Sequence, residues 1–538
     1  MTMKHILHFA LMVTLSLMPN FIFSQAPTLG TAANFVLFST DGAVTSTGIS
    51  QLTGNIGTNN GPSTGFGNVN GVMHSNDLVT AQCAADLLIA YNQLDFAIPT
   101  FFPSPLLGNG AVFNEGVYSV SGAAILDGGL TFNAQGDENA VFIVQIEGAF
   151  STNANSQILL LNGAQACNIF WKVEGLVSMA SGTLMKGTII ANNAAITMST
   201  NNVLEGRALS TTGAITVDGV LSFTPIGCGS PELTGPIAPT LGETVCYALF
   251  SANGTVSNVG ITFVTGDVGT NGGLATGFDA DNVNGTIHAN PDTSTALAAS
   301  DLFTVNTYLT TLSHDIELLY PAQFGNELVL TPHTYLLNAA TVLTNTLYLN
   351  AQDNEDAVFV IKIAGALSTS TFSNVVLING AQSKNVYWKV DGATSISDYS
   401  NFKGTLVGHN GAVDLATGVV LDGRAFTTTG GLSTAAITAE ITAGCTTLVI
   451  DENIENNNSR FGFYPNPFDN SLNITINKNL SINNASLIIF DVSGREVLRS
   501  VFTNSVTTFN TSAFASGMYF YKVIVNNEIL QTGKLIAK

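Results

Sequence analysis

Two clusters of acidic residues are the first side chains in this sequence that could do chemistry. Asp137 and Glu138 lie in one predicted turn, and Asp353, Glu355 and Asp356 lie in a second turn of similar sequence. Carboxylate oxygens are ligands that Ca²⁺ prefers. The spacing matches no EF-hand loop, however, and charged residues in turns are usually solvated. We therefore interpret both clusters as solvated turn residues and predict no metal site.

Two histidines, His74 and His288, occupy matching positions ahead of two predicted helices. A histidine that acts as a general base needs a nucleophile or an acid within hydrogen-bonding reach, and none recurs at a fixed spacing here. We expect both rings to satisfy local backbone groups. The remaining histidines form no pair with metal-ligand spacing, and the glycine-rich turns lack the Lys-Ser/Thr ending of a nucleotide-binding loop. The sequence predicts no catalytic residue, no cofactor and no small-molecule substrate.

The balance of charged and apolar residues restricts the possible partners. Hydrophobic residues make up 46% of the 538 residues and charged residues only 10%, which predicts that most of the chain folds. The net charge of −21 argues against nucleic acid and anionic membranes as partners. The surface must be covered by small polar and apolar groups, because the cations between residues 25 and 445 are only Lys172, Lys186, Arg207, Lys362, Lys384, Lys389, Lys403 and Arg424.

The N-terminal segment, 1–24, is typical of a secretory signal peptide. Lys4 precedes the apolar run Ile6–Met18, and Ser24 offers a small residue for cleavage before Gln25. An uncleaved membrane anchor is the alternative, although the apolar run is short. Export permits disulfides, and the five cysteines leave at least one unpaired within the chain. Cys246 and Cys445 bracket the second of the two repeats described next and could join its ends.

A long internal repeat divides most of the chain into two homologous domains. The segment 133–142 (NAQGDENAVF) recurs as 350–359 (NAQDNEDAVF), so the numbering offset is 350 − 133 = 217. Three shorter motifs, 162–165, 171–173 and 206–208, recur at the same offset. We therefore predict one domain at 27–228 (repeat one), a linker at 229–239 and a second domain at 240–445 (repeat two).

A shorter period within each domain predicts a β-solenoid. Val177-Ser-Met179, Ile196-Thr-Met198 and Ile215-Thr-Val217 follow one another at a constant spacing, since 196 − 177 and 215 − 196 both equal 19. This period fits a coil of three short strands and their turns. Because side chains alternate across a strand, the first residues of these motifs should point inward and the second ones outward, each in a stacked column. A sandwich of hairpins is the competing interpretation, but it predicts no constant rung length.

One segment in each domain has helical rather than strand periodicity. Residues Asp77–Phe96 begin with an acidic residue and carry alanine and leucine at helical spacing, and Asp292–Leu312 are their counterpart. We expect each to form one helix that lies along a solenoid face and covers apolar strand residues.

The composition changes after Cys445. A polar linker at 446–460 precedes a segment, 461–538, with several short strand patterns and much of the positive charge. These patterns predict a small C-terminal β-sandwich.

The motifs TGNIGT (53–58), NVNGVMH (68–74), NAQGD (133–137), NGAQ (162–165), FWKV (170–173) and GRAL (206–209), in this order, resemble the microbial ice-binding domain. Both repeats match over nearly their whole length. The resemblance implies two right-handed β-solenoids of triangular section, each with one long flanking α-helix, in a mainly β protein. Residues 461–538 similarly resemble the sorting domain of type IX secretion. Together they imply a secreted or cell-surface protein whose partners are the ice surface and the secretion machinery.

Given that resemblance, the charge-free outward columns are the predicted ice-binding residues. In repeat one the first column holds Ala149, Leu176, Ala195 and Ala214, and the second holds Ser151, Ser178, Thr197 and Thr216, with Thr212 extending the array at the last rung. The equivalents in repeat two are Ala366, Ala393, Ala412 and Gly431, followed by Ser368, Ser395, Asp414 and Ser433. Asp414 should disturb ordered water locally. The face with Lys186, Glu205 and Arg207 is expected to be a poor ice plane.

A second class of function remains open at this point. Right-handed β-helices also serve as polysaccharide lyases and as adhesin stalks. A lyase needs a groove with clustered cations, which this chain lacks. A cell-surface adhesin or carbohydrate-binding solenoid is the alternative, although exposed aromatic side chains would favour sugar binding and the predicted columns contain none.

Overall fold

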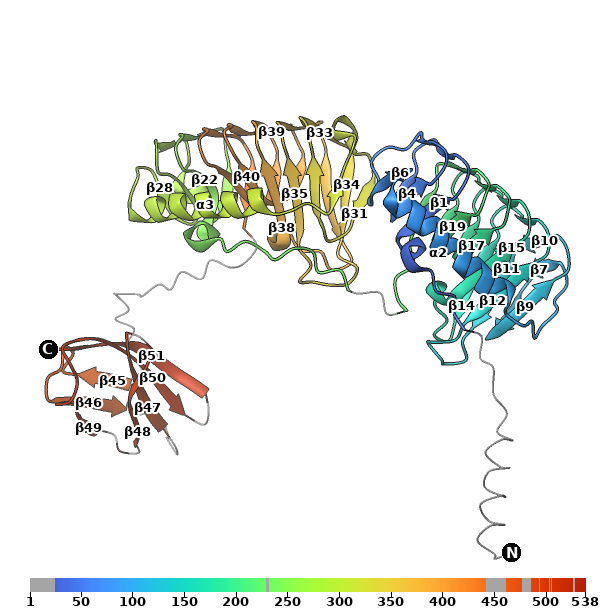
Figure 1. The fold of residues 1–538 in the computed structure, drawn as a ribbon. Coiled ribbons are helices and arrows are strands. Elements are labelled where there is room, and N and C mark those ends of the chain that lie inside the picture. The colour runs from blue at the N-terminus through green and yellow to red at the C-terminus, as the bar shows by residue number, and fades with distance from the viewer. Residues whose placement is uncertain are drawn as a thin grey trace, which may run out of the picture. The chain divides into compact units, whose positions relative to one another are not determined.

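The computed structural model describes residues 25–228, 232–441, 461–476, 485–492, 494–502, 504, 506–525 and 528–538. The described residues up to 441 form one compact unit, and those from 461 onward form another. The predicted signal peptide (1–24) and the linker at 446–460 lie outside the described residues. The first unit contains two solenoids of parallel strands, each with one long helix, and the second contains antiparallel sheets only (Figure 1). This is the mainly β architecture that the sequence predicts.

Each solenoid has one separate eight-stranded parallel sheet. In repeat one its spatial order is β5 (Ser63–Thr64), β2 (Val44–Thr47), β20 (Ile215–Asp218), β18 (Ile196–Met198), β16 (Val177–Met179), β13 (Phe150–Thr152), β10 (Ala124–Asp127) and β7 (Leu106–Gly108). In repeat two it is β26 (Ala275–Thr276), β23 (Val256–Val259), β43 (Leu432–Ala435), β41 (Val413–Leu415), β39 (Thr394–Ile396), β36 (Leu367–Thr369), β33 (Thr341–Thr344) and β30 (Phe324–Gly325).

A second sheet forms the other two faces of each solenoid, because its longest strands bend around a corner. In repeat one the face beside the helix comprises β6 (Met73–Ser75), β4 (Asn55–Thr58), β1 (Phe35–Ser39), β15 (Ile169–Val173), β12 (Phe142–Ile146), β9 (Gly116–Val120) and the second halves of β19 (Val203–Ser210) and β17 (Leu184–Ala191). The third face comprises the first halves of β19 and β17 with β3 (Gln51–Thr53), β21 (Leu221–Phe223), β14 (Gln157–Leu161), β11 (Gly129–Asn133) and β8 (Ala111–Asn114).

Repeat two has the same arrangement. Its helix-side strands are β28 (Ile287–His288), β25 (Asp267–Thr270), β22 (Tyr247–Ser251), β42 (Val420–Thr427), β40 (Asn401–Gly408), β38 (Val386–Val390), β35 (Phe359–Ile363), β32 (Thr334–Leu337) and β29 (Ile316–Glu317). Its third face adds β27 (Val283–Asn284), β24 (Phe263–Thr265), β44 (Thr438–Glu440), β37 (Asn374–Ile378), β34 (Thr346–Asn350) and β31 (Leu328–Leu330).

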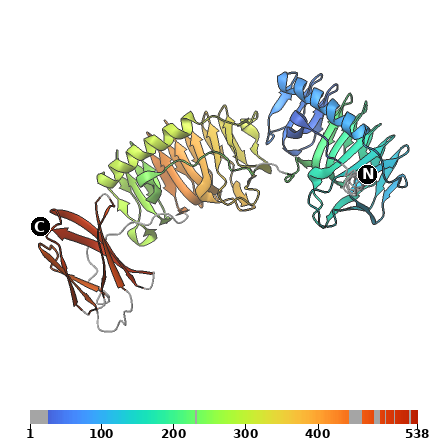
Figure 2. The ribbon, with the colours of Figure 1, turned by 60° about the horizontal axis from the view of Figure 1, so that its bottom comes forward.

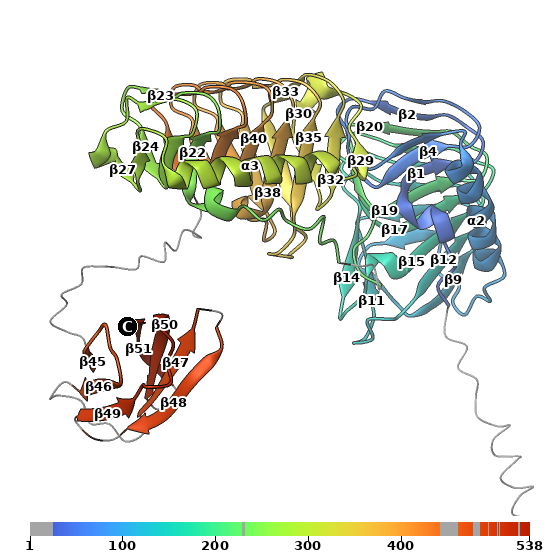
Figure 3. The ribbon, with the colours of Figure 1, turned by 60° about the vertical axis from the view of Figure 1, so that its left-hand side comes forward.

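The order of rungs in space differs from their order in the sequence. The N-terminal strand β2 pairs with β20, which is near the C-terminal end of the same repeat. The helix α2 (Leu78–Asp95) then carries the chain back along the solenoid to the strands at the opposite end (Figure 3). Its 18 residues span about 27 Å, close to the height of about six stacked strands at ~4.8 Å each.

Both predicted helices are present at nearly the predicted bounds. Asp77 caps α2 and Asp292 caps α3 (Thr293–Thr311), each in a capping box with the threonine three residues later. The inner side of α2 packs Leu87, Ala90 and Leu94 onto strand residues such as Phe170 and Ile190. Helix α3 lies along its solenoid in the same way (Figure 2). The expectation that the helices cover apolar strand residues is confirmed.

The prediction of a constant rung length is only partly right. Val177, Ile196 and Ile215 are register partners in one inward column, as their constant spacing predicts. The same column continues to Phe150 and Ala124, however, and there the numbering steps are 177 − 150 = 27 and 150 − 124 = 26. Longer loops at the corners absorb the extra residues without changing the strand register.

The second half of the predicted linker packs against repeat two. The backbone N–H of Val358 donates to Thr234 O (2.9 Å), Tyr308 Oη donates to Ile237 O (2.6 Å), and Asn354 Nδ2 donates to Leu233 O (3.2 Å). Residues 232–239 therefore belong structurally to the second solenoid.

The C-terminal unit is the predicted small β-sandwich. One sheet contains β45 (Phe461–Tyr464), β46 (Ser471–Ile476) and β49 (Val506–Asn510), and the other contains β48 (Glu496–Phe502), β47 (Ala485–Asp491), β50 (Gly517–Val525) and β51 (Glu528–Ala537). Side chains from both sheets, including Phe461, Leu472, Leu487 and Leu535, share one core.

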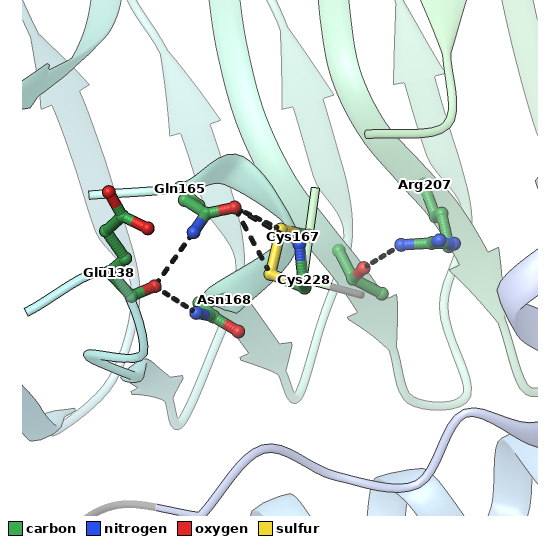
Figure 4. Close-up of a disulfide and its surroundings, with 7 residues drawn as sticks. Glu138, Gln165, Cys167, Asn168, Arg207 and Cys228 are labelled. Atoms are coloured by element: carbon green, nitrogen blue, oxygen red, sulfur yellow. Dashed lines mark hydrogen bonds between the residues drawn. A yellow bond between two sulfur atoms is a disulfide. The ribbon is translucent and has the colours of Figure 1, made fainter. Parts of the chain in front are cut away.

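One disulfide, between Cys167 and Cys228, joins the C-terminal end of repeat one to a short 3-10 helix, and the Gln165 side chain lies beside both sulfurs (Figure 4). Cys83 is free and buried against the solenoid. Cys246 is disulfide-bonded, and the partner that the sequence predicts for it, Cys445, lies outside the described residues.

Candidate functional site

The outward side of the eight-stranded sheet in repeat one carries an uninterrupted column of hydroxyl groups. Successive register partners place the side chains at equivalent positions on neighbouring strands. We call this set the hydroxyl column of repeat one: Thr64, Thr45, Thr216, Thr197, Ser178 and Ser151. The predicted alignment of Ser151, Ser178, Thr197 and Thr216 is therefore present. Neighbouring members are one strand spacing apart, about 4.8 Å.

A second outward column lies two residues earlier on each strand, about 6.7 Å away. Backbone hydrogen bonds link Ala43, Ala214, Ala195, Leu176 and Ala149 from rung to rung, for example Ile196 N–H to Ala214 O (2.9 Å). Each of them precedes a fully buried residue, so alternation directs its own side chain outward. Most members are alanines, as predicted. These alanine side chains project less far from the sheet than the side chains of the hydroxyl column beside them.

A glycine-rich corner brings these rungs close together. A Cβ on Gly213 would lie 2.0 Å from the Ala194 carbonyl oxygen, and one on Gly148 would lie 2.6 Å from the Ala123 nitrogen. Buried hydroxyls fix the same corner from the inside, because Ser39 Oγ donates to Gly213 O (2.8 Å) and Ser210 Oγ donates to Ala194 O (2.8 Å). The outward columns therefore stand on a backbone with little freedom to shift between rungs.

The column is longer than the sequence alone predicts. Thr45 Oγ1 donates to Thr216 Oγ1 (3.3 Å), so β2 and β5 extend the sheet beyond β20. The signal was present, since Gly42-Ala-Val-Thr45 has the pattern of Gly213-Ala-Ile-Thr216. At the opposite end the column ends in two exposed apolar residues, Ile125 and Leu106, which the sequence pattern did not predict either.

The predicted position of Thr212 in the array is wrong. Strand β20 is not the last rung, and Thr212 lies in the corner before Gly213, outside the strand. Its Oγ1 donates to Asn193 Oδ1 (2.9 Å) on the neighbouring rung. Thr212 therefore borders the alanine column and does not extend the hydroxyl column.

Repeat two has an equivalent but less regular column. Its register partners are Thr276, Ser257, Ser433, Asp414, Ser395, Ser368 and Val342. The column beside it contains Thr255, Gly431, Ala412, Ala393 and Ala366. Asp414 is exposed, and its Oδ1 accepts a hydrogen bond from Ser433 Oγ at 2.6 Å. One carboxylate thus lies among the serines and accepts the hydrogen bond that one of their hydroxyl groups donates.

Charged side chains lie at the margins of the columns in repeat one. Asp218 and Asp127 are in the next outward position of their strands, beyond the hydroxyl column. Lys186 and Glu205 form an ion pair on the third face, as predicted. Arg207 does not share that face, because the strand turns at Gly206 and its Nε donates to Ala33 O at 2.8 Å. Burial lowers the pKa of the Arg207 guanidinium to about 10.

The residues that suggested catalysis have structural partners. His74 Nδ1 lies 2.7 Å from Asp77 Oδ2, and His288 Nδ1 lies 2.5 Å from Asp292 Oδ2. Both rings therefore contact the aspartate that caps a helix, and the prediction that they contact backbone groups is wrong. The Asp137 side chain accepts the Asn139 N–H within its turn (2.9 Å). Among the described residues no group of three or more histidine, cysteine or acidic side chains is arranged to hold a metal ion.

One buried cation, Lys172, neutralises part of an acidic cluster beneath the end of α2. Its Nζ contacts Asp95, Glu147 and Glu174 at 2.7, 3.1 and 2.9 Å. Burial opposes its charge, but these hydrogen bonds raise the pKa of Lys172 above its ordinary value. The cluster connects the helix to the solenoid and lies on the helix side, away from the hydroxyl column.

Together the two columns form a binding surface and not a reaction pocket. The two columns present methyl and hydroxyl groups on a regular grid of about 4.8 by 6.7 Å. Such groups hold surface water without the tight hydration shell of an ion, and many weak water-mediated contacts can act together.

Comparison with known proteins gives the family. Residues 38–221 and 250–439 match the family described as ice-binding-like, and residues 462–538 match a secretion system C-terminal sorting domain. An ice-binding protein of Nostoc sp. (strain HG1) is 40% identical over 194 residues, which cover 35% of this chain and 71% of the relative. One of Flavobacterium frigoris (strain PS1) is 28% identical over 201 residues, 34% of this chain and 70% of the relative.

A solved structure resembles most of the chain. The crystal structure of an ice-binding protein from an Antarctic bacterium of the Flavobacteriaceae is 62% identical, with a TM-score of 0.76, and covers 78% of this chain and 100% of its own. None of the helices in the described part of the chain is long and apolar enough to cross a membrane. The sorting domain indicates export to the cell surface or beyond it. The chain therefore belongs to the ice-binding-like family, with two copies of the family's domain ahead of a secretion sorting domain.

Proposed function

We propose that the mature chain adsorbs to ice through the outward side of the eight-stranded sheets. The observation that carries the proposal is the register of Thr64, Thr45, Thr216 and Thr197, which places four threonines on consecutive rungs. The family membership of both repeats supports the same activity. The ligand surface comprises the hydroxyl column and the alanine column beside it.

The physical basis is the match between a rigid grid and a rigid lattice. Ice presents oxygen atoms with no net charge, so a binding surface must order water without competing for it as an ion does. Threonine provides a methyl group that excludes disordered water and a hydroxyl group that anchors ordered water. Each contact is weak, and the glycine-rich corner keeps the rungs aligned so that many contacts form together.

The threonine-rich end of repeat one is the strongest candidate for the centre of the site. The opposite end becomes apolar at Leu176, Ile125 and Leu106, all of them exposed. In repeat two the carboxylate of Asp414 interrupts the column. We therefore assign the larger share of ice affinity to repeat one.

Export is assigned to the C-terminal unit, with the type IX secretion machinery as its partner. The match to a sorting domain covers nearly all of that unit.

Ice-recrystallisation and thermal-hysteresis assays test the proposal directly. Purified protein of residues 25–538 should slow the coarsening of ice grains at micromolar concentration and lower the freezing point below the melting point. A glycan array run in parallel tests the adhesin alternative. Unchanged grain coarsening together with glycan binding would replace this proposal with the alternative.

A further inference from the structure

The two solenoids contact each other through their ends, where buried asparagine side chains of repeat one form hydrogen bonds with repeat two. The Asn70 side chain donates to Thr331 Oγ1 (3.0 Å) and accepts a hydrogen bond from Tyr335 Oη (2.7 Å). The Asn68 side chain accepts the Tyr320 N–H (2.9 Å) and donates to Tyr320 O (3.0 Å). Asn70 is 3% exposed and Asn68 is 9% exposed. We call this contact the junction.

Small residues permit the close approach at the junction. Gly67, between Phe66 and Asn68, belongs to the end of repeat one that faces repeat two. The atom nearest to a Cβ built on Gly67 is Gln323 Oε1 of repeat two, at 3.8 Å. The space beside Gly67 would therefore accept one methyl group, and a larger group would have to displace the Gln323 side chain.

Because the repeats are homologous, each half of the junction occurs a second time at a free end of the tandem. Asn282 and Asn284, in the segment GFDADNVNG (277–285), correspond to Asn68 and Asn70 in GFGNVNG (65–71). At the other end Tyr118 corresponds to Tyr335, because its Oη lies 2.7 Å from Asn114 O as that of Tyr335 lies 2.7 Å from Thr331 O. A second molecule could in principle stack on either end.

Both free ends differ from the junction at the residues that would make contact. Where repeat one has Gly67, repeat two has Asp279-Ala280-Asp281, and all three residues are exposed. With the offset of 217, Tyr320 corresponds to Pro103, which has no N–H to donate, and Pro332 corresponds to Glu115. Glu115 would enter the same contact, because its counterpart Pro332 follows the junction residue Thr331. Stacking two molecules would thus bury the carboxylates of Asp279 and Asp281 in a contact that already holds a third one, which is strongly unfavourable.

We propose that the free ends of the tandem are blocked copies of the junction surfaces, so that a second copy of this chain cannot add to either end. Head-to-tail contacts between two different surfaces produce rings where the rotation closes and filaments where it does not. Asp279, Asp281, Pro103 and Glu115 prevent that outcome, while Gly67 permits the same contact inside the chain.

Restoring the glycine and the tyrosine of the junction at the free ends, and removing the charge of Glu115, tests the proposal. The variant is made in a protein of residues 25–538. One glycine replaces the three residues Asp279-Ala280-Asp281 at the free end of repeat two. Pro103→Tyr and Glu115→Gln change the free end of repeat one. Sedimentation velocity is measured from about 5 to about 500 µM protein. The upper end of this range approaches the millimolar effective concentration that a short linker gives the two halves of the junction. The weight-average sedimentation coefficient should rise with concentration for this variant and stay constant for the native chain. Adding Asn284→Ala should abolish the rise. A constant coefficient for the restored variant, or a rising one for the native chain, would overturn the proposal.

Inserting the blocking residues into the junction is the reciprocal test, and it requires no contact between two molecules. Replacing Gly67 by Asp-Ala-Asp should open the junction and increase the radius of gyration in small-angle X-ray scattering, with a native circular dichroism spectrum. Gly67→Ala is the matched control and should leave the radius unchanged, because the added methyl fits. An unchanged radius for the Asp-Ala-Asp variant would mean that these residues do not block the contact.

Discussion

Thr45 donates a hydrogen bond to Thr216 although 171 positions separate the two residues in the sequence. The contact joins the first strand of the eight-stranded sheet in chain order to its last one. It makes the hydroxyl column of repeat one continuous across the point where the chain begins and ends its solenoid. Thr216 is consequently an interior member of the column, with threonines on both neighbouring strands.

A bulky side chain at Thr216 should remove most of the ice activity of repeat one. Thr216→Tyr lifts the protein off a flat lattice over several rungs, because the ring rises above the methyl and hydroxyl groups beside it. The side chain points outward, so the free energy of unfolding should change by no more than about 0.5 kcal/mol. Thermal hysteresis of residues 25–538 measures the effect, and circular dichroism checks the fold.

Thr131→Tyr is the matched control for that change. Thr131 also points outward from a strand of repeat one, but it lies on the third face. The hysteresis of this variant should equal that of the native chain. An equal loss in both variants would mean that the hydroxyl column is the wrong surface.

Asp414→Thr should increase the contribution of repeat two. The change removes a tightly hydrated carboxylate and releases the Ser433 hydroxyl that donates to it. The gain is measured best in the Thr216→Tyr background, where repeat two supplies most of the remaining activity. Asp414→Asn keeps an oxygen that can accept from Ser433 but removes the charge, and it should give an intermediate value. If the three variants have the same hysteresis, charge at this position does not limit ice adsorption.

The periodic parts of the structure were predictable from the sequence. Asp77 and Asp292 begin helical patterns, and the observed helices start at the next residue in both repeats. The alternation in Ile196-Thr-Met198 assigns Thr197 to the outside, because a strand has a strict period of two. Local rules of this kind apply wherever the chain continues without a corner.

The parts that depend on distant segments were not predicted. Thr45 joins the column only because α2 returns the chain to the other end of the solenoid. The segment 42–45 has the pattern of 213–216, but this pattern does not show that the two strands are neighbours. Arg207 has the same parity as Glu205, so the alternation alone predicts that both side chains lie on the same face. The strand turns at Gly206, so the guanidinium instead lies beneath the backbone of Ala33. Corners change which face a residue occupies, and their positions depend on the stacking of rungs.

Two neighbouring glycines in repeat two should respond oppositely to an added methyl group. A Cβ on Gly430 would lie 2.1 Å from Gly411 O, whereas one on Gly431 would have Thr255 O as its nearest atom, at 3.5 Å. Gly430→Ala should therefore lower the free energy of unfolding by about 1–3 kcal/mol. Gly431→Ala completes the alanine column and should be neutral or stabilising by up to about 1 kcal/mol. Chemical denaturation of both variants measures the contrast, and similar losses would contradict the role of the corner.

Removal of the C-terminal unit should leave the ice activity intact. The solenoids and the sandwich are separate compact units, and the sandwich has its own core. A protein of residues 25–446 should therefore match the hysteresis of residues 25–538 at equal molar concentration. Its export from a host with the secretion machinery should be lost. A clearly lower hysteresis in the shorter protein would assign part of the ice surface to the sandwich.

The helix cap at Asp292 should make stability depend on acid pH. A hydrogen bond with the His288 ring, followed by the one from the Thr295 N–H, holds the pKa of Asp292 below its usual value. A depressed folded-state pKa means that the ionised form stabilises the fold above the unfolded value of about 3.9. That contribution is lost as the pH falls through the folded value. Asp292→Ala should therefore cost about 1 kcal/mol at pH 7, and the difference from the native chain should shrink below about pH 4. Denaturation curves at pH 7, 5 and 3 measure this, and a difference that stays constant with pH would show that the carboxylate charge at Asp292 does not stabilise the helix.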